Sequence, residues 1–450
     1  MKDLTQYRVG ALALLAASCA PAHAAMGHSS SLYGVLPADM ASAQALSLFS
    51  TSTSALFYNP AHLTRDERGE LTGAILHGDH DLRAKSQGGE DPQERDSDTI
   101  NDTPTQQFLL GMKTDVSRLF SFTDHPMQFG FMVGLEKFSR ELVAFESRSS
   151  EEPQFFRYER QPLFLALGAG TPVWQGISAG VSARVTLHNE ASLHTTSDLE
   201  GNTERETLNV SAEPVIQPVL GVSINWGETI CEVAQCWQDN LDTAFAFRAH
   251  TYSRTAVEAN AVIPGTIPEP GLDIRLRTLD SFQPATWSAA VRYDLGRLRL
   301  GAALELQEWS RLEESLRRDD VKTDREGNLE VELRDVLVPR VGADYSWTNH
   351  LKVTGGLAWE RSPLRDGLTP DVNYLDNDRL VLGLGGTLAV ENPPLLDWPA
   401  EFGIAYQYHW LDERDFDLAS DDPNAPQGAF ETVTAEGHVH VFSGSVSLRF

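Results

Sequence analysis

The chain has 450 residues, of which 41% are hydrophobic and 22% are charged, and its formal net charge is −28 at pH 7. This acidity argues against nucleic acid as a partner, because proteins that bind it neutralise phosphates with lysine and arginine. The mean hydropathy of −0.28 is that of a water-soluble protein. Past the first residues no apolar run approaches the roughly 18 residues that a membrane helix needs.

The first 24 residues have the layout of a secretory signal. Lys2 and Arg8 precede an apolar stretch from Val9 to Ala20, and Ala22-His23-Ala24 provides a small-x-small cleavage site. We therefore expect residues 1–24 to be removed on export. Cys19 raises the alternative of a lipoprotein, but the residues before it lack the leucine of a usual lipoprotein signal. Ordinary cleavage after residue 24 is favoured.

Residues 25–69 do not alternate between apolar and polar side chains. They are rich in small residues, contain apolar anchors and include the rigid turn Asn59-Pro60-Ala61. This composition predicts that residues 25–69 fold as a compact insert. The insert would lie inside a barrel formed by residues 70–450, whose sequence pattern is of a different kind. A disordered leader is the alternative, but the segment is more apolar than disordered segments are.

From residue 70 to Phe450 the chain repeats a two-residue alternation. Residues 177–188, for example, carry an apolar side chain at every odd position and a small or polar one at every even position. The recurrence of such runs is typical of an all-β transmembrane barrel, in which lipid-facing and lumen-facing residues alternate. We predict about fourteen antiparallel strands from these runs and the turn clusters between them. They lie near residues 70–85, 105–116, 126–142, 154–171, 176–191, 206–226, 242–256, 282–294, 297–310, 332–346, 350–361, 378–391, 401–412 and 436–450.

The connections between these runs alternate in length. Those at 170–175, 294–296 and 347–350 are short, whereas the connections on the other side are long and polar. Barrels of the Gram-negative outer membrane have short periplasmic turns and longer external loops, so both chain ends are expected in the periplasm. The expected external loops are residues 86–104, 191–205, 257–281, 311–331, 362–377 and 413–435.

Cys231 and Cys236 lie in a connection that this alternation makes periplasmic. Because the periplasm is oxidising, we predict a disulfide between them. A metal site is the competing interpretation, but no histidine or further cysteine lies at ligand spacing. The sequence thus predicts neither a metal nor a cofactor.

The end of the insert reads Ala55-Leu56-Phe57-Tyr58-Asn59-Pro60-Ala61-His62-Leu63. This segment resembles the Asn-Pro-Ala signature of the FadL family, outer-membrane transporters for long-chain fatty acids and other hydrophobic compounds that include a toluene-type branch. The chain departs from the family in its acidity, in its cysteine pair and in His62, where the family has glycine. Further similar stretches are 339–345, 359–363, 369–371, 377–379 and the C-terminal aromatic residue.

The resemblance implies a barrel in the cell outer membrane that is plugged by its N-terminal hatch. Cargo would be captured from outside and released laterally through an opening in the wall beside a strand kink, whose position the sequence does not give. The implied partners are a long-chain fatty acid or another hydrophobic small molecule and the surrounding lipid and lipopolysaccharide. A monomer is expected.

The inward positions of the predicted strands lean basic, although the whole chain is acidic. Arg184, Arg248 and Arg340 fall on that face, where a cargo carboxylate would find charge-assisted hydrogen bonds. An alkyl chain would bind beside them, since each buried methylene contributes about 0.8 kcal/mol. Alternatively, the arginines pair with acids on neighbouring strands and hold the wall together. The predicted alkyl-binding residues are Phe164, Leu32, Tyr33 and Phe49.

These observations predict a transporter rather than an enzyme. A general porin or a surface adhesin is the second hypothesis, and a porin would admit small hydrophilic solutes to liposomes. An outer-membrane lipid hydrolase is the third, but the chain has no Gly-x-Ser-x-Gly motif and no zinc-type histidine pair.

Overall fold

The computed structural model describes most of the chain after residue 24. The predicted signal, residues 1–24, lies outside the described part. The described residues are 25–26, 28–87, 104–117, 126–137, 163–197, 203–231, 236–263, 267–312, 332–369, 376–394, 397–419 and 429–450.

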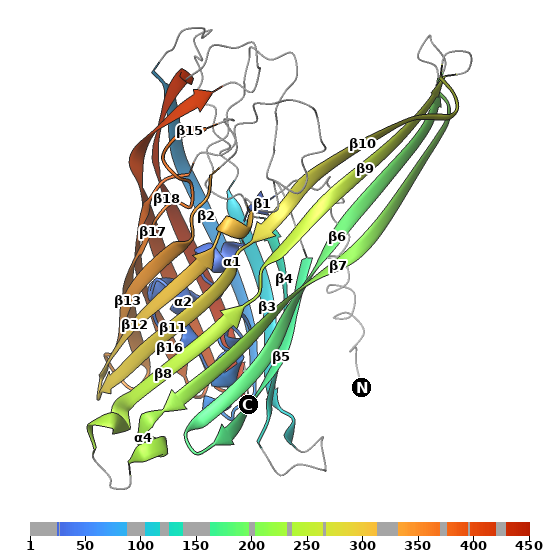
Figure 1. Ribbon diagram of the computed structural model, residues 1–450. Helices are drawn as coiled ribbons and strands as arrows, with labels where there is room; N and C mark the ends of the chain where they lie inside the picture. Colours follow the sequence, from blue (N-terminus) through green and yellow to red (C-terminus); the bar gives the residue numbers. More distant parts are fainter. Residues whose placement is uncertain are drawn as a thin grey trace.

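A closed antiparallel barrel of 14 strands forms the body of the protein (Figure 1). Each wall strand pairs with the next one, and the barrel closes where β18 pairs with β2 from Arg449–Glu70 to Val433–Ser86. The predicted barrel and its number of strands are confirmed. The wall strands are β2 (Glu70–Ser86), β3 (Thr105–Asp115), β4 (Gln128–Lys137), β5 (Leu163–Trp174), β6 (Ile177–Ser197), β7 (Thr203–Asn225), β8 (Leu241–Arg248), β11 (Ala285–Leu295), β12 (Leu298–Glu308), β13 (Val336–Ser346), β14 (Leu351–Glu360), β16 (Arg379–Val390), β17 (Ala400–Ala419) and β18 (Ala429–Arg449).

Side chains alternate across this wall as predicted. On β12, Leu300 and Leu304 are 42% and 50% exposed, whereas Ala303 is 6% exposed. Exposed apolar side chains on a closed barrel form the band that lipid covers, and the alternate residues face the bore. The tight β5–β6 and β11–β12 turns contain Gly176 and Gly296, whose φ angles of 74° and 67° favour glycine.

Three of the predicted external loops are hairpin strands instead. Pairing between β6 and β7 runs to Ser197 and Thr203, and pairing between β17 and β18 runs to Ala419 and Ala429. A third hairpin, β9–β10, follows β8. Polar sequence does not prevent such pairing, because each strand satisfies the backbone hydrogen bonds of the other. The predictions that were wrong are the loops at 191–205, 257–281 and 413–435.

Four strands form an arm that extends away from the barrel (Figure 1). In it, β9 (Thr251–Ile263) pairs with β10 (Ile267–Gln283) in antiparallel and with β6 in parallel orientation. β7 leaves the wall at Pro218, because Val219–Arg248 is the last pair of the β7–β8 ladder. Proline has no N–H to donate to a ladder, so it suits this point of separation. Two short parallel strands complete the sheet, β1 (Ala25–Met26) beside β10 and β15 (Leu368–Thr369) beside β17.

Residues 28–69, which we call the insert, lie inside the barrel (Figure 1). Tyr33 and Met40 are fully buried in one cluster with inward side chains of β2, β17 and β18, and Leu56 packs in another with inward side chains of β2 to β5. No helix in the described part of the chain is long and apolar enough to cross a membrane. The helices of the insert are α1 (Ser29–Leu32), α2 (Pro37–Ala41), η1 (Ser47–Phe49), α3 (Ala55–Tyr58) and η2 (Pro60–Arg65).

The β7–β8 turn carries two short helices and a disulfide. α4 (Trp226–Ile230) and η4 (Trp237–Asn240) flank Cys231 and Cys236, which are joined to each other. Arg65, at the end of the insert, pairs with Glu228 on α4 at 3.0 Å. The turn thus fastens the end of the insert to the barrel end at which the C-terminus lies (Figure 1).

Candidate functional site

The Asn-Pro-Ala turn of the insert rests on a row of glycines in the wall. Gly170, Gly180 and Gly221 are register partners on β5, β6 and β7. A methyl group added to any of them would overlap Asn59 or Pro60. The main chain of the turn therefore touches the wall directly, and glycine alone leaves the room for it.

Asn59 uses both atoms of its buried amide to hold this turn. Its oxygen accepts a hydrogen bond from the N–H of Ala61 at 3.2 Å. Its nitrogen donates to the carbonyl of Leu48 at 3.1 Å and to that of Val222 on β7 at 3.4 Å. The motif predicted from the sequence is therefore both the N-cap of η2 and a link between the insert and the wall.

A second row of glycines carries another part of the insert. Gly301, Gly342, Gly356 and Gly383 are consecutive register partners on β12, β13, β14 and β16. Added methyl groups would overlap the insert at Gly301, Gly356 and Gly383. We call the two rows the glycine seats. The sequence analysis missed them, although glycine at inward positions of four successive strands is a signal it could have used.

The insert has a strained backbone beside the second seat. Ala43 and Gln44 adopt positive φ angles of 47° and 64°, which costs non-glycine residues about 1 kcal/mol or more each. The amide of Gln44 holds this conformation by donating to the carbonyls of Ser31 and Leu32, each at 3.1 Å. Contacts with both the wall and the insert therefore fix the bend.

Arg184, on β6, forms a buried ion pair. Its Nη2 donates to Oε2 of Glu136 on β4 at 2.6 Å, and its guanidinium lies 3.8 Å from the ring centroid of Phe164 on β5. The two charged side chains are 3% and 1% exposed. Nε and Nη1 of Arg184 have no hydrogen-bond partner among the described residues.

The other two predicted arginines contact the insert. Nη1 of Arg340 donates to the carbonyl of Ala43 at 3.2 Å, and its Nη2 lies 3.5 Å from Glu305. Arg248 stacks 4.2 Å from the ring centroid of Phe57 and donates to the carbonyl of that residue at 3.5 Å. The pairs Arg184–Glu136 and Arg340–Glu305 fit the interpretation in which the arginines pair with acids of the wall. The contacts of Arg248 and Arg340 with the insert were not predicted. Binding of the arginines to a cargo stays a prediction.

The four predicted alkyl-binding residues are all buried, but they do not gather at one place. Phe164 packs with Leu56 and its neighbours, whereas Leu32 and Tyr33 pack against β2, β17 and β18. Phe49 belongs to a third cluster and contacts the ring of His62, with centroids 5.6 Å apart. The pKa of the His62 imidazole is well below its ordinary value because of burial and the nearby Arg292. The ring that packs against Phe49 is therefore neutral.

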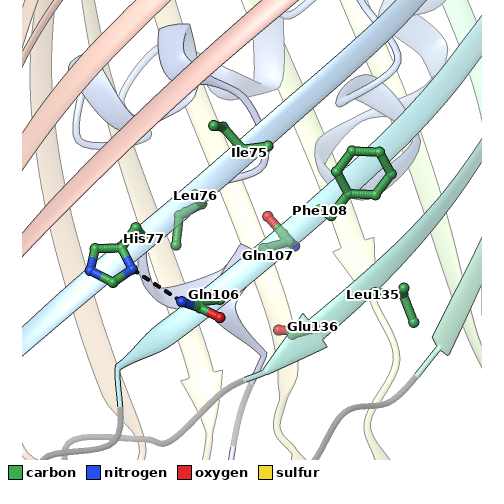
Figure 2. Close-up of a pocket in the computed structure, with 8 residues that line it drawn as sticks. All are labelled: Ile75, Leu76, His77, Gln106, Gln107, Phe108, Leu135 and Glu136. Carbon is green, nitrogen blue, oxygen red and sulfur yellow. Dashed lines mark hydrogen bonds between the residues drawn. The ribbon is translucent and has the colours of Figure 1, made fainter. Parts of the chain in front are cut away.

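A pocket of about 350 Å³ lies at the wall formed by β2, β3 and β4 (Figure 2). Its outer lip is apolar, with Ile75, Phe108 and Leu135 between 47% and 62% exposed. His77 and Gln106 add a polar pair 3.5 Å apart. Leu135–Leu163 is the last β4–β5 pair in the described part of the wall. The pocket thus lies beside the last described pair of the β4–β5 ladder, and we call it the wall pocket.

The inner side of the wall pocket contacts α1 of the insert. Leu76, Gln107 and Glu136 are neighbours in one register row and are at most 5% exposed. Gln107 donates to the hydroxyl of Ser30 at 3.0 Å, and the backbone N–H of Ser29 donates to Glu136. An object passing the wall here would have to displace α1 and to part the backbone ladder that joins β2, β3 and β4.

Asp39, on α2 of the insert, makes stability depend on pH. Desolvation by burial raises the pKa of this carboxyl from 3.8 to about 6, although hydrogen bonds with Ser47, Ser54 and the N–H of Leu36 oppose the rise. The folded protein therefore binds this proton more tightly than the unfolded chain does. The resulting stabilisation is complete below a pH of 3.8 and is lost as the pH rises through about 6.

We expect Asp39→Asn to abolish this part of the pH dependence and to raise the melting temperature near neutral pH. Each pKa unit corresponds to about 1.4 kcal/mol of free energy of unfolding. Thermal unfolding of both proteins from about pH 4 to about pH 7 measures the difference, which should grow with pH. A constant difference between the two curves would contradict the assignment to Asp39.

These features define a class of protein before any comparison: a transmembrane β-barrel of 14 strands. Inward glycines of its wall contact the N-terminal insert. No profile of a known protein family matches the sequence. The chain is, however, 42% identical to Alkane uptake protein A of Marinobacter nauticus over 444 residues, which cover 98% of this chain and 95% of that protein. It belongs to the same family as Alkane uptake protein A.

Solved structures agree on the fold. A FadL homologue of Pseudomonas aeruginosa has a TM-score of 0.60 at 17% identity and covers 95% of this chain and 99% of its own. The toluene transporter TodX of Pseudomonas putida has a TM-score of 0.54 at 13% identity, with 93% and 99% covered. At these identities the likeness speaks for the FadL-type fold, which confirms the resemblance drawn from the sequence.

Proposed function

We propose that the protein is an outer-membrane transporter that takes up alkanes and related hydrophobic compounds. The observation that carries this proposal is the 42% identity, over nearly the whole of both chains, to a protein named for alkane uptake. The exposed apolar band of the barrel suits an outer membrane, with phospholipid and lipopolysaccharide around a monomer. The insert acts in this proposal as the hatch that keeps the bore closed to water-soluble compounds.

The proposed route leaves the bore sideways through the wall pocket. Cargo enters from outside, passes between insert and wall, and reaches lipid over the apolar lip formed by Ile75, Phe108 and Leu135. An alkane gains little by continuing to the aqueous periplasm, because transfer of its surface from water to lipid is the favourable step. The contacts of α1 with Gln107 and Glu136 would open during passage.

The porin and hydrolase hypotheses are weaker. The insert fills space that an open pore would need, since residues such as Tyr33, Met40 and Ala45 are fully buried there. The relative and TodX are, by name, an uptake protein and a transporter, which favours transport over hydrolysis. Uptake of labelled hexadecane by proteoliposomes, without swelling in small sugars, is the expected result. Swelling without hexadecane uptake would support the porin.

We expect Leu135→Trp to slow hexadecane uptake several-fold, because the indole ring is larger than the leucine side chain and would fill the lip of the wall pocket. Leu163→Trp is the matched control: Leu163 is the register partner of Leu135 on β5 and is similarly exposed, but does not line the pocket. Initial uptake rates in proteoliposomes compare the two variants. Equal rates would argue against this exit route.

A further inference from the structure

The Glu136–Arg184 pair lies where the insert, the bore and the wall pocket meet. Glu136 lines the wall pocket, and its Oε2 accepts from Arg184 at 2.6 Å. Its Oε1 accepts from the backbone N–H of Ser29 on α1, and Nδ1 of His28 lies 3.9 Å from Oε2. A buried carboxylate is thus held by an arginine and by a main-chain amide of the insert.

This arrangement is the one that a fatty-acid headgroup would need. A free carboxylate in an apolar bore is stabilised by a charge-assisted hydrogen bond from arginine and by backbone N–H donors. Arg184 is kept in position by the ring of Phe164, 3.8 Å away, and is 3% exposed. The protein's own carboxylate therefore occupies the place at which a cargo carboxylate would bind.

We propose that Glu136 determines the specificity of the transporter, by occupying Arg184 and so reserving the wall route for uncharged cargo. A carboxylate brought to this place would meet the negative charge of Glu136 in a buried setting. Even at Nε and Nη1 of Arg184, which no described residue occupies, it would share one cation with Glu136, so one of two buried negative charges would lack a counter-charge. An alkane adds no charge. The inference rests on the proposed uptake of hydrophobic compounds and adds that compounds carrying a carboxylate are excluded from the wall route.

The Arg340–Glu305 pair provides a matched control within the same bore. Its nitrogen and oxygen atoms are 3.5 Å apart, and both side chains are at most 9% exposed. Glu305 does not line the wall pocket. Removing its charge frees a second buried arginine at a place where the inference predicts no gain for carboxylates.

The experiment measures binding of labelled hexadecanoate and hexadecane to the purified barrel, and reports the ratio of the two affinities. For Glu136→Gln, which keeps the shape of the side chain, the ratio should shift toward hexadecanoate by at least about tenfold, as a newly available charge-assisted hydrogen bond would produce. Glu305→Gln should leave the ratio near that of the unmodified protein. The double variant Glu136→Gln/Arg184→Gln should lose the gain.

Three outcomes would overturn the inference: no shift in folded Glu136→Gln, an equal shift in Glu305→Gln, or a gain that survives in the double variant. Heat-modifiable gel mobility reports folding. A test on the unmodified protein needs no variant: 1-hexadecanol should compete with hexadecane, whereas hexadecanoate should compete at least about tenfold less well. Equal competition would also refute the inference. Failure of the unmodified protein to bind hexadecane at all would instead refute the proposed function.

Discussion

Alanine in place of Gly356 is expected to displace the insert and to admit small hydrophilic solutes to the bore. The added methyl group would overlap the carbonyl of Ser42 and crowd the N–H of Ala43. These are main-chain atoms, so no side chain can rotate away to make room. Overpacking of this kind costs about 1–3 kcal/mol, and movement of the insert is the available relief.

Liposome swelling in small sugars and thermal unfolding measure the effect of Gly356→Ala. The control is Gly355→Ala, one residue away, where an added methyl group would find only the carbonyl of Gly383 at 3.7 Å and a methyl of Leu384 at 4.0 Å. That variant should stay closed and be slightly stabilised, because glycine in a strand loses more chain entropy on folding than alanine does. Two equally closed and equally stable variants would contradict the role of the second glycine seat.

Arg340→Gln should destabilise the protein by at most about 3 kcal/mol, the lower end of the cost of an uncompensated buried charge, because it leaves Arg248 as the remaining cation near Glu305. It also removes the hydrogen bond of 3.2 Å to the carbonyl of Ala43, which holds the bend of the insert. Chemical unfolding followed by heat-modifiable mobility gives the change in free energy. We expect increased protease sensitivity of the insert in the same variant.

The double variant Arg340→Gln/Glu305→Gln separates the two interpretations of this arginine. If Arg340 mainly holds the wall, removing both charges together should restore most of the lost stability and leave hexadecane uptake near that of the unmodified protein. If Arg340 binds cargo, stability should recover while uptake remains low. With the two single variants this double variant completes a double-mutant cycle, which gives the coupling free energy between Arg340 and Glu305.

The barrel could be predicted from the sequence because its signal is local and repeated. A run such as 177–188 fixes which side chains face out without any knowledge of its neighbours. The arm could not be predicted, because the parallel pairing of Ala191 with Val257 and of Thr196 with Val262 joins distant segments. Polar composition in such segments suggests a loop until the partner strand is known.

The candidate site was predicted only in part for the same reason. The Asn-Pro-Ala turn is a short motif, so its residues are visible in sequence, and the inward parity of Arg184 follows from alternation. The pairing of Arg184 with Glu136 depends on how β4, β5 and β6 align, and no local pattern encodes that alignment. For the glycine seats, the inward parity of each glycine could be seen in the sequence, but their alignment into rows depends on the register of the strands.

The glycine seats have a consequence for how selectivity could be changed by evolution or by engineering. A methyl group added at Gly180, Gly356 or Gly383 would meet main-chain atoms of the insert. Main-chain atoms are the same whatever the residue. The contact between these wall glycines and the insert therefore does not depend on which side chains the insert carries at those points. New side chains could therefore be tried on the insert, to suit longer or bulkier molecules, while the surrounding cylinder stays as it is.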